Sequence, residues 1–364
     1  MQVHNSLYIN PSYITARYDV IERTVSETQI SARIQNFRSN KFKGIVSKQS
    51  IRKIRLGVQW LLFMAKPKDV HDPATGKTVK YKAGLLTLSL PTGNEDLPPA
   101  FFRDTLLPSF LGSAKYYFSL ENYIWKLERQ SRGALHAHIT IDQFLPYQWV
   151  LDTWCKILDK HGLLESYRER FAALTESEYI RYRQSADSRK YIAKFSEPRE
   201  YLLSLRAAYA KGAACNWSKP NCTDIHSVRK VSNLAAYMAK YLTKDPKLGE
   251  GFKGRFWSCS QKLSQLRSVR VDLNDTALLT AGAMFDTVAS GYKDIIYWHK
   301  HTGEPKFLGA IYFLKRSFRE LMQVPILRDM CAYLDMFYHN STLPDIPIFA
   351  YQGGRLEAYT PSSN

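Results

Sequence analysis

The sequence predicts an α+β fold, and three kinds of pattern support this prediction. Two segments, 123–130 and 135–141, alternate apolar and polar residues with a period of two, which is typical of strands that bury one face. A more continuous apolar run at 84–90 is typical of a central strand. Amphipathic helical spacing is found instead in three other segments, 47–66, 98–113 and 146–162.

The charge of the chain indicates a polyanionic partner. The 364 residues include 51 Lys and Arg against 33 Asp and Glu, which gives a net charge of +18 at pH 7. Such an excess favours nucleic acid first, with a membrane surface as the alternative. The basic residues are spread along the chain, which favours a broad binding surface, and the 23 tyrosines offer rings that can stack on unpaired bases.

Several protein classes are disfavoured by local sequence. Five irregularly spaced cysteines and no N-terminal secretory pattern indicate a reducing compartment. The longest apolar run, 56–65, is interrupted by Gln59 and is too short to cross a bilayer, so no membrane partner is expected. Gly76-Lys77-Thr78 resembles the end of a phosphate-binding loop, but His71 stands where that loop needs Gly, so we interpret the segment as a turn.

The two alternating segments form a predicted hairpin with a candidate metal site. His136 and His138 share one face of their strand, because side chains alternate along a strand. If the hairpin folds about Arg132, then Glu128 lies opposite His136 and Lys126 lies opposite His138. A mixed histidine and carboxylate set suits Mg or Mn with a phosphate, or Zn. The alternative is two ordinary histidines and a solvated carboxylate on a polar sheet face.

A second candidate element is a short helix over 233–244. Tyr237 and Tyr241 are four residues apart and therefore share one face, with Lys240 and Lys244 each three residues after a tyrosine. A helix that offers two phenols and two ammonium groups to one surface is unusual. The alternative is an amphipathic helix with half-buried tyrosines and lysines that extend to solvent.

A charged helical segment over 163–211 contains a similar but weaker motif. Tyr191 and Lys194 have the same spacing as Tyr237 and Lys240 but lack a second tyrosine. The motif also precedes the strand expected before the tyrosine helix. It is therefore the weaker of the two candidate motifs.

The order of these motifs resembles the HUH endonuclease superfamily, and within it the rolling-circle replication initiators of single-stranded DNA phages and related plasmids. Three motifs carry the resemblance over roughly residues 82 to 245: an apolar strand (85–91), the histidine strand (132–138) and the tyrosine helix (237–241). The segment 254–260 also resembles one that follows the tyrosine helix in phage members.

The resemblance implies a fold and a domain organisation. We expect a central antiparallel five-stranded sheet of HUH type, flanked by helices, in a domain over 81–272 with a helical insertion at about 146–215. Residues 1–80 are expected to form a helical and basic N-terminal extension. Residues 273–364 are expected to form a mostly helical C-terminal region of unknown role.

The resemblance also implies an activity. It predicts metal-dependent, sequence-specific cleavage of single-stranded DNA by Tyr237 or Tyr241, which leaves a 5′-phosphotyrosyl link and a free 3′-hydroxyl and allows later rejoining. Glu128, His136 and His138 would hold a divalent ion, Mg or Mn, and the two lysines would stabilise negative charge. Which tyrosine attacks first, and whether the second is only structural, stays open.

The resemblance implies that the partners are single-stranded DNA at a replication origin, a host polymerase and a host helicase. It also implies that the protein acts in the cytoplasm of a bacterial host. Two alternatives remain. One is an HUH relaxase or transposase, which would use the same chemistry for another purpose. The other is a non-enzymatic basic protein that binds single-stranded nucleic acid, in which the histidines and tyrosines only pack or stack.

Overall fold

The computed structural model describes most of the first two thirds of the chain and separate strands of the last third. A few single positions between these segments are also described. The described segments are 3–21, 46–73, 76–130, 133–187, 192–227, 254–266, 269–273, 289–298, 302–314, 348–352 and 355–359.

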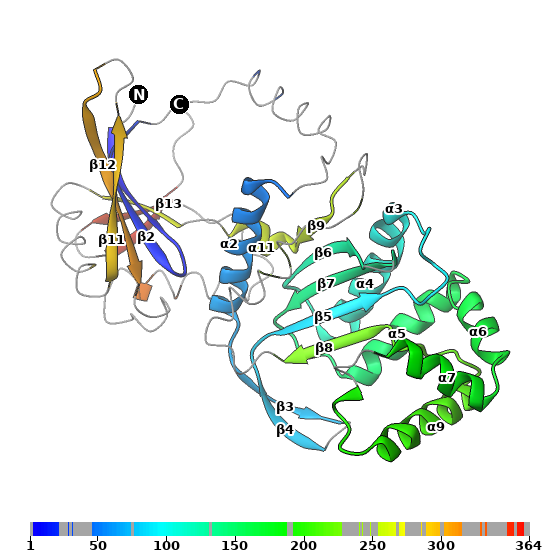
Figure 1. Ribbon diagram of the computed structural model, residues 1–364. Coiled ribbons are helices and arrows are strands. Elements are labelled where there is room, and N and C mark those ends of the chain that lie inside the picture. Colours follow the sequence, from blue (N-terminus) through cyan, green and yellow to red (C-terminus); the bar gives the residue numbers. More distant parts are fainter. Residues whose placement is uncertain are drawn as a thin grey trace.

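Five antiparallel strands form the sheet that carries the predicted hairpin, in the order β8-β5-β7-β6-β9 (Figure 1). This confirms the α+β class and the antiparallel five-stranded sheet. The strands lie side by side in the order Thr223–Ser227 (β8), Gly84–Ser89 (β5), Leu135–Ile141 (β7), Tyr123–Arg129 (β6) and Trp257–Cys259 (β9).

One face of this sheet is covered by helices that follow β5 and β7. Apolar residues such as Leu86 and Leu127 pack there in one core with Phe110 and Trp154. The opposite face carries the two histidines and is partly covered by α2, where Gly57 lets the helix approach Ile124 closely. The helices that follow β5 and β7 are α3 (Pro99–Phe101), the π-helical turn η1 (Phe102–Leu106), α4 (Leu107–Phe118) and α5 (Tyr147–Lys160). The helices α2 (Lys48–Met64) and α11 (Gln261–Gln265) contribute to the other core.

The predicted insertion is helical and has a small aromatic core of its own, in which Phe171 and Trp217 stack with ring centroids 5.3 Å apart. A separate hairpin follows α2, and the turn predicted at Gly76 lies between its strands. No helix among the described residues is long and apolar enough to cross a membrane. The helices of the insertion are α6 (Glu165–Ala172), α7 (Glu176–Ala186) and α9 (Pro198–Ala214). The strands of the separate hairpin are β3 (Lys68–Asp72) and β4 (Lys77–Tyr81).

The two ends of the chain meet in a second sheet, which corrects part of the predicted organisation. Its seven strands have the order β11-β12-β2-β1-β10-β13-β14, and all pairs are antiparallel except β10 with β13. They span Val3–Ile9 (β1), Tyr13–Ile21 (β2), Val269–Leu273 (β10), Ala289–Trp298 (β11), Pro305–Leu314 (β12), Ile348–Gln352 (β13) and Arg355–Tyr359 (β14).

The expected mostly helical C-terminal region is therefore wrong for most of the described residues of 273–364. The expected helical N-terminal extension is wrong for 3–21. The segments 289–298 and 305–314 are rich in aromatic and β-branched residues, which favour strands, and Gly303 in the connection between them has a positive φ of 68°. The physical reason for the error is that β12 pairs with β2 and β10 pairs with β1, and local periodicity does not reveal such distant partners.

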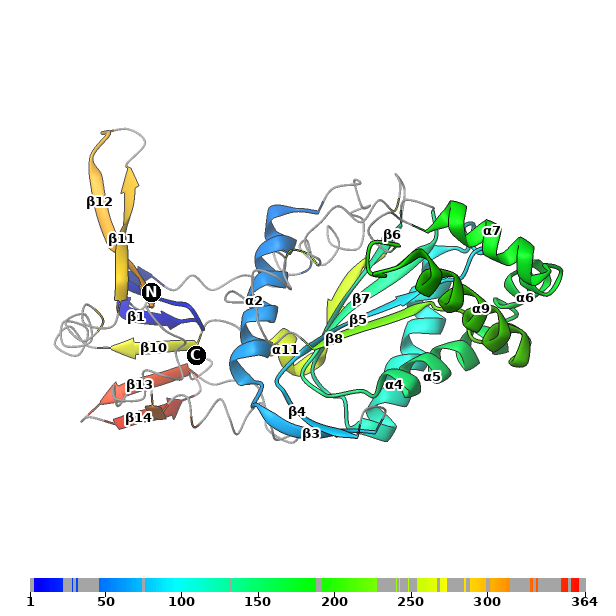
Figure 2. The same cartoon turned by 60° about the horizontal axis from the view of Figure 1, so that its bottom comes forward.

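Helix α2 lies between the two sheets (Figures 1 and 2). Leu7 and Val271 of the seven-stranded sheet belong to the same buried core as Ile54 and Val58 of α2 and Leu85 of the five-stranded sheet. Each of these side chains is at most 3% exposed. Burial of such side chains stabilises a fold by about 1.5–3 kcal/mol each, so the shared core is a strong link between the two sheets.

The pairing of β12 with β2 depends on Gly309, which has a φ of 143° and pairs with Arg17. A Cβ at this position would overlap the carbonyl oxygen of Ala16. We expect Gly309→Ala to lower the free energy of unfolding by about 2 kcal/mol or more, because the strand must shift or accept strain. The matched control is Gly291→Ala in β11, where a Cβ meets no heavy atom within 4 Å. Urea unfolding followed by circular dichroism should separate the two variants, and equal midpoints would contradict this pairing.

Candidate metal centre

The register of β6 and β7 brings the three predicted ligands together. Glu128 lies directly opposite His136, and Lys126 lies directly opposite His138, as the sequence predicted. Opposite residues in an antiparallel pair project from the same face, so the carboxylate and both imidazoles converge. The hairpin closes with Gly133 at a φ of 90°, and the backbone N–H of Gln130 donates to the carbonyl of Ala134 at 2.9 Å.

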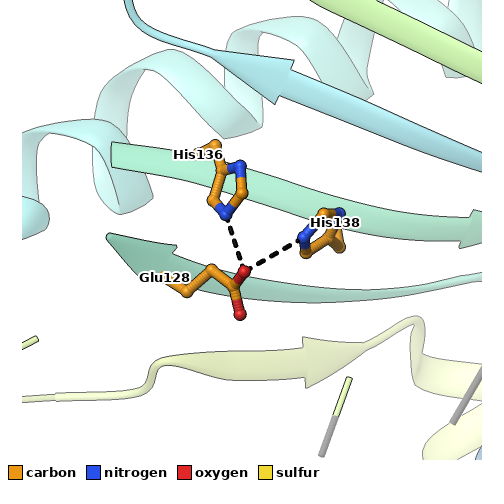
Figure 3. A group of neighbouring side chains, drawn as sticks. All are labelled: Glu128, His136 and His138. Carbon is orange, nitrogen blue, oxygen red and sulfur yellow. Dashed lines mark hydrogen bonds and ion pairs between the residues drawn. The ribbon is translucent and has the colours of Figure 1, made fainter. Parts of the chain in front are cut away.

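Both imidazoles point one ring nitrogen at the same carboxylate oxygen (Figure 3). Glu128 Oε1 lies 2.8 Å from His136 Nε2 and 3.2 Å from His138 Nε2. The centroids of the two rings are 4.5 Å apart. His136 and His138 are each 8% exposed, so both imidazoles are largely shielded from solvent.

This donor set fits a divalent cation. One donor atom from each of Glu128, His136 and His138 lies within 4.8 Å of the other two. Adjacent ligands of an octahedral ion with bonds of about 2.1 Å are separated by roughly 3 Å, which is close to both observed donor separations. Three protein ligands leave positions for water or a phosphate oxygen. The group can therefore hold a metal ion and leave coordination positions open.

Lys126 completes the electrostatics of the site. Its side chain is fully buried, and its Nζ donates to Glu128 Oε2 at 2.8 Å. The ammonium group therefore holds the carboxylate oxygen that does not face the histidines, which leaves Oε1 directed at both of them. A buried ammonium is tolerated only next to a compensating anion, so Lys126 and Glu128 depend on each other.

Two titratable ligands have shifted pKa values. Burial alone would raise the pKa of Glu128, but hydrogen bonds from His136, His138 and Lys126 outweigh burial and hold the pKa well below its usual range. Burial lowers the pKa of His136, and the hydrogen bond with Glu128 only partly opposes this effect. At neutral pH the carboxylate is therefore ionised and the His136 imidazole is neutral, which are the forms that bind a metal.

The outward ring nitrogens of both histidines also have partners, which the sequence did not identify. Thr87 Oγ1 lies 3.0 Å from His138 Nδ1. Gln130 Nε2 lies 3.1 Å from His136 Nδ1 and 3.2 Å from Ser89 Oγ. Thr87 and Ser89 are two residues apart in β5 and share a face, and the strand pairing places them opposite His138 and His136 respectively.

The tyrosine helix lies mostly outside the described residues. Tyr237, Tyr241 and Lys244 are not among them, and neither is Tyr191 of the weaker motif. Lys240 is described as helical and exposed. Leu242 is helical and fully buried in the core formed with α2, which also contains residues of the histidine-bearing face.

Two further residues near this face are described. His226 of β8 is 59% exposed in its side chain and pairs with Asp224 at 2.7 Å, outside the ligand group. Arg255 is exposed and lies two residues before the edge strand β9, which pairs with β6 beside Lys126. The sequence alone gives no reason to place this segment next to the hairpin.

The ligand assignment can be tested with two histidine substitutions. We expect His138→Ala to weaken Mn²⁺ binding by at least about 10-fold, because it removes one of three protein donors but keeps the Lys126–Glu128 pair. His226→Ala is the matched control, and it should bind Mn²⁺ as the unmodified protein does. Isothermal titration calorimetry measures both affinities. Equal affinities of the two variants would rule out His138 as a ligand.

The lowered pKa of His136 predicts the pH dependence of metal binding. A histidine with an ordinary pKa of about 6.5 is half protonated at that pH, and its proton then competes with the metal. Because the pKa of His136 is lower, its contribution to Mn²⁺ affinity should persist to about pH 6.5 and decline only in more acidic solution. Titrations between about pH 5 and 8 would show this, and a decline centred at about pH 6.5 or above would contradict it.

The chain was also compared with known proteins. No family model, curated protein or solved structure matches it. The function is therefore inferred from the geometry of this site and from the resemblance of its motifs.

Proposed function

We propose that this protein is a rolling-circle replication initiator that cleaves and rejoins single-stranded DNA through a tyrosine. The observation that carries the proposal is the convergence of Glu128, His136 and His138 on one face of an antiparallel five-stranded sheet. The order of the apolar strand, the histidine strand and the tyrosine helix supports it, as does the net charge of +18.

The proposed reaction is phosphodiester transfer. The phenol oxygen of Tyr237 or Tyr241 attacks a DNA phosphorus, so that the bond from tyrosine to phosphorus forms and the bond from phosphorus to the 3′-oxygen breaks. The phenol proton is lost, and the departing 3′-oxygen gains a proton to become a hydroxyl. Because the phosphotyrosyl bond retains the energy of the cleaved bond, a 3′-hydroxyl can later attack it and reseal the strand without ATP.

The metal ligands and the nearby lysines have separate proposed roles in this reaction. Glu128, His136 and His138 would hold the ion, for which Mg or Mn is proposed, and the ion when bound would polarise the phosphate oxygens. Lys126 orients Glu128 from its buried side. Lys240, exposed on its helix, is proposed to stabilise negative charge on the phenolate or the phosphate, and Lys244 would serve the second tyrosine in the same way.

Binding of the DNA backbone is assigned to exposed cations around the site. Arg255 is the described candidate nearest in the strand order, because β9 borders β6. An arginine there is suited to a phosphate next to the one that is cleaved, since its guanidinium forms paired hydrogen bonds with phosphate oxygens. The free 3′-hydroxyl would prime a host polymerase, and a host helicase would unwind the DNA ahead of it.

The proposal predicts a covalent complex with DNA. A 3′-labelled single-stranded oligonucleotide with a phage-type hairpin origin should become linked to the protein when Mn²⁺ is added and remain free in EDTA. The combined Tyr237→Phe and Tyr241→Phe substitutions should abolish the linkage, because phenylalanine has no attacking oxygen. A denaturing gel measures the labelled protein band.

The controls distinguish the competing functions. Tyr116 is 81% exposed on α4, and α4 packs on the sheet face opposite the histidines. Tyr116→Phe should therefore not alter the linkage. If the double variant still forms the adduct, the nucleophile lies elsewhere, and Tyr191→Phe is the next variant to test. Cleavage of a transfer origin in preference to a phage-type origin would favour a relaxase. Binding without any adduct would favour a non-enzymatic protein.

A further inference from the structure

We infer that Ser89 and Gln130 form a reversible hydrogen-bond relay that selects which ring nitrogen of His136 carries the proton, so that Gln130 is a positioning residue for the metal ligand. The inference deepens the proposed function, because it rests on His136 being a ligand through Nε2. It concerns residues of β5 and of the hairpin turn, neither of which is in the ligand group.

The arrangement of the relay defines one tautomer of His136. The amide nitrogen of Gln130 lies 3.1 Å from His136 Nδ1 and donates to it. A neutral imidazole carries one proton, so the proton then resides on Nε2, which donates to Glu128 Oε1 at 2.8 Å. In this state the Nε2 lone pair is not available to a cation.

Metal binding requires the opposite tautomer. A cation bound at Nε2 takes that lone pair, so the ring proton must reside on Nδ1 and needs an acceptor there. Gln130 provides one if its amide turns over, because the amide oxygen and nitrogen have nearly the same size and position. The Ser89 hydroxyl, which accepts from Gln130 Nε2 at 3.2 Å, can then rotate its hydrogen and donate to the amide oxygen.

The surroundings hold the backbone of Gln130 and Ser89 in place while the amide turns over. The backbone N–H of Gln130 donates to Ala134, and its carbonyl accepts from Gly133, both at 2.9 Å. The backbone N–H of Ser89 donates to Cys222, and the Ser89 carbonyl accepts from the buried Trp154 at 2.9 Å. The relay therefore reverses through the amide orientation and the hydroxyl hydrogen, with both backbones fixed.

His138 does not need such a relay. Its Nδ1 lies 3.0 Å from the hydroxyl of Thr87, and a hydroxyl is both a donor and an acceptor. Rotation of one hydrogen is enough to suit either tautomer of His138. The two ligands thus differ in what metal binding demands of their neighbours, and Gln130 is the side chain that must reorient.

Two substitutions of Gln130 test the relay in opposite directions. Gln130→Glu replaces the amide with a group that accepts from Nδ1–H, and it should tighten Mn²⁺ binding by about 10-fold. Gln130→Met has a similar length but no polar atoms, and it should weaken binding by about 10-fold, within the range of 10–100-fold seen when a partner of a metal ligand is removed. Isothermal titration calorimetry on the full chain measures both. Gln148→Glu, an exposed charge change on α5, is the control and should leave the affinity unchanged.

A nuclear magnetic resonance measurement gives a second and independent readout. The ring nitrogens of His136 should show the proton on Nε2 in the metal-free protein, and on Nδ1 after addition of Mg²⁺. In Gln130→Glu the proton should already reside on Nδ1 without metal, which a merely structural role of Gln130 would not produce. The inference is overturned if the metal-free protein already carries the proton on Nδ1, or if both variants bind Mn²⁺ with unchanged affinity.

These results are distinguishable from failure of the proposed function. If the protein binds no metal, the proposed function fails, while the tautomer in the metal-free protein and in Gln130→Glu still tests the relay. If metal binds normally and only the Gln130 effects are missing, the relay fails alone.

Discussion

The candidate site depends on the pairing of β6 with β7 in a single register. Because side chains alternate between faces, a shift of one residue would move His136 and His138 into the apolar core that now contains Leu135 and Ala137. The cost of burying two imidazoles there and exposing the apolar residues fixes the register. The force that fixes the metal geometry is therefore the hydrophobic burial of the other face of the same strands.

Charge is balanced locally at this site even though the chain as a whole is strongly basic. The buried ammonium of Lys126 compensates Glu128, so the ligand group is held together by its own charges. The same pair restrains the carboxylate, since an ammonium on Oε2 and two imidazoles on Oε1 leave it little freedom. Such a preorganised site loses less conformational entropy when it binds an ion than a flexible one would.

The second sheet gives the molecule a larger shared core than the five-stranded sheet and its helices alone would have. Helix α2 packs against both sheets, and Leu242 from the tyrosine motif region is buried in that same core. The proposed catalytic face and the N- and C-terminal strands are thus linked through α2. A change that loosens the seven-stranded sheet would be transmitted to this face through packing rather than through any direct contact with the metal ligands.

The sequence by itself determined the α+β class, the hairpin at 123–141 and the set of Glu128, His136 and His138, because these depend on local alternation and on one short turn. It did not determine the seven-stranded sheet, which joins segments more than 250 residues apart along the chain. The partners Thr87 and Gln130 and the position of β9 beside β6 were likewise decided only by tertiary structure. The physical reason is that strand periodicity specifies which side chains share a face, whereas the choice of neighbouring strand depends on burial gained across the whole chain.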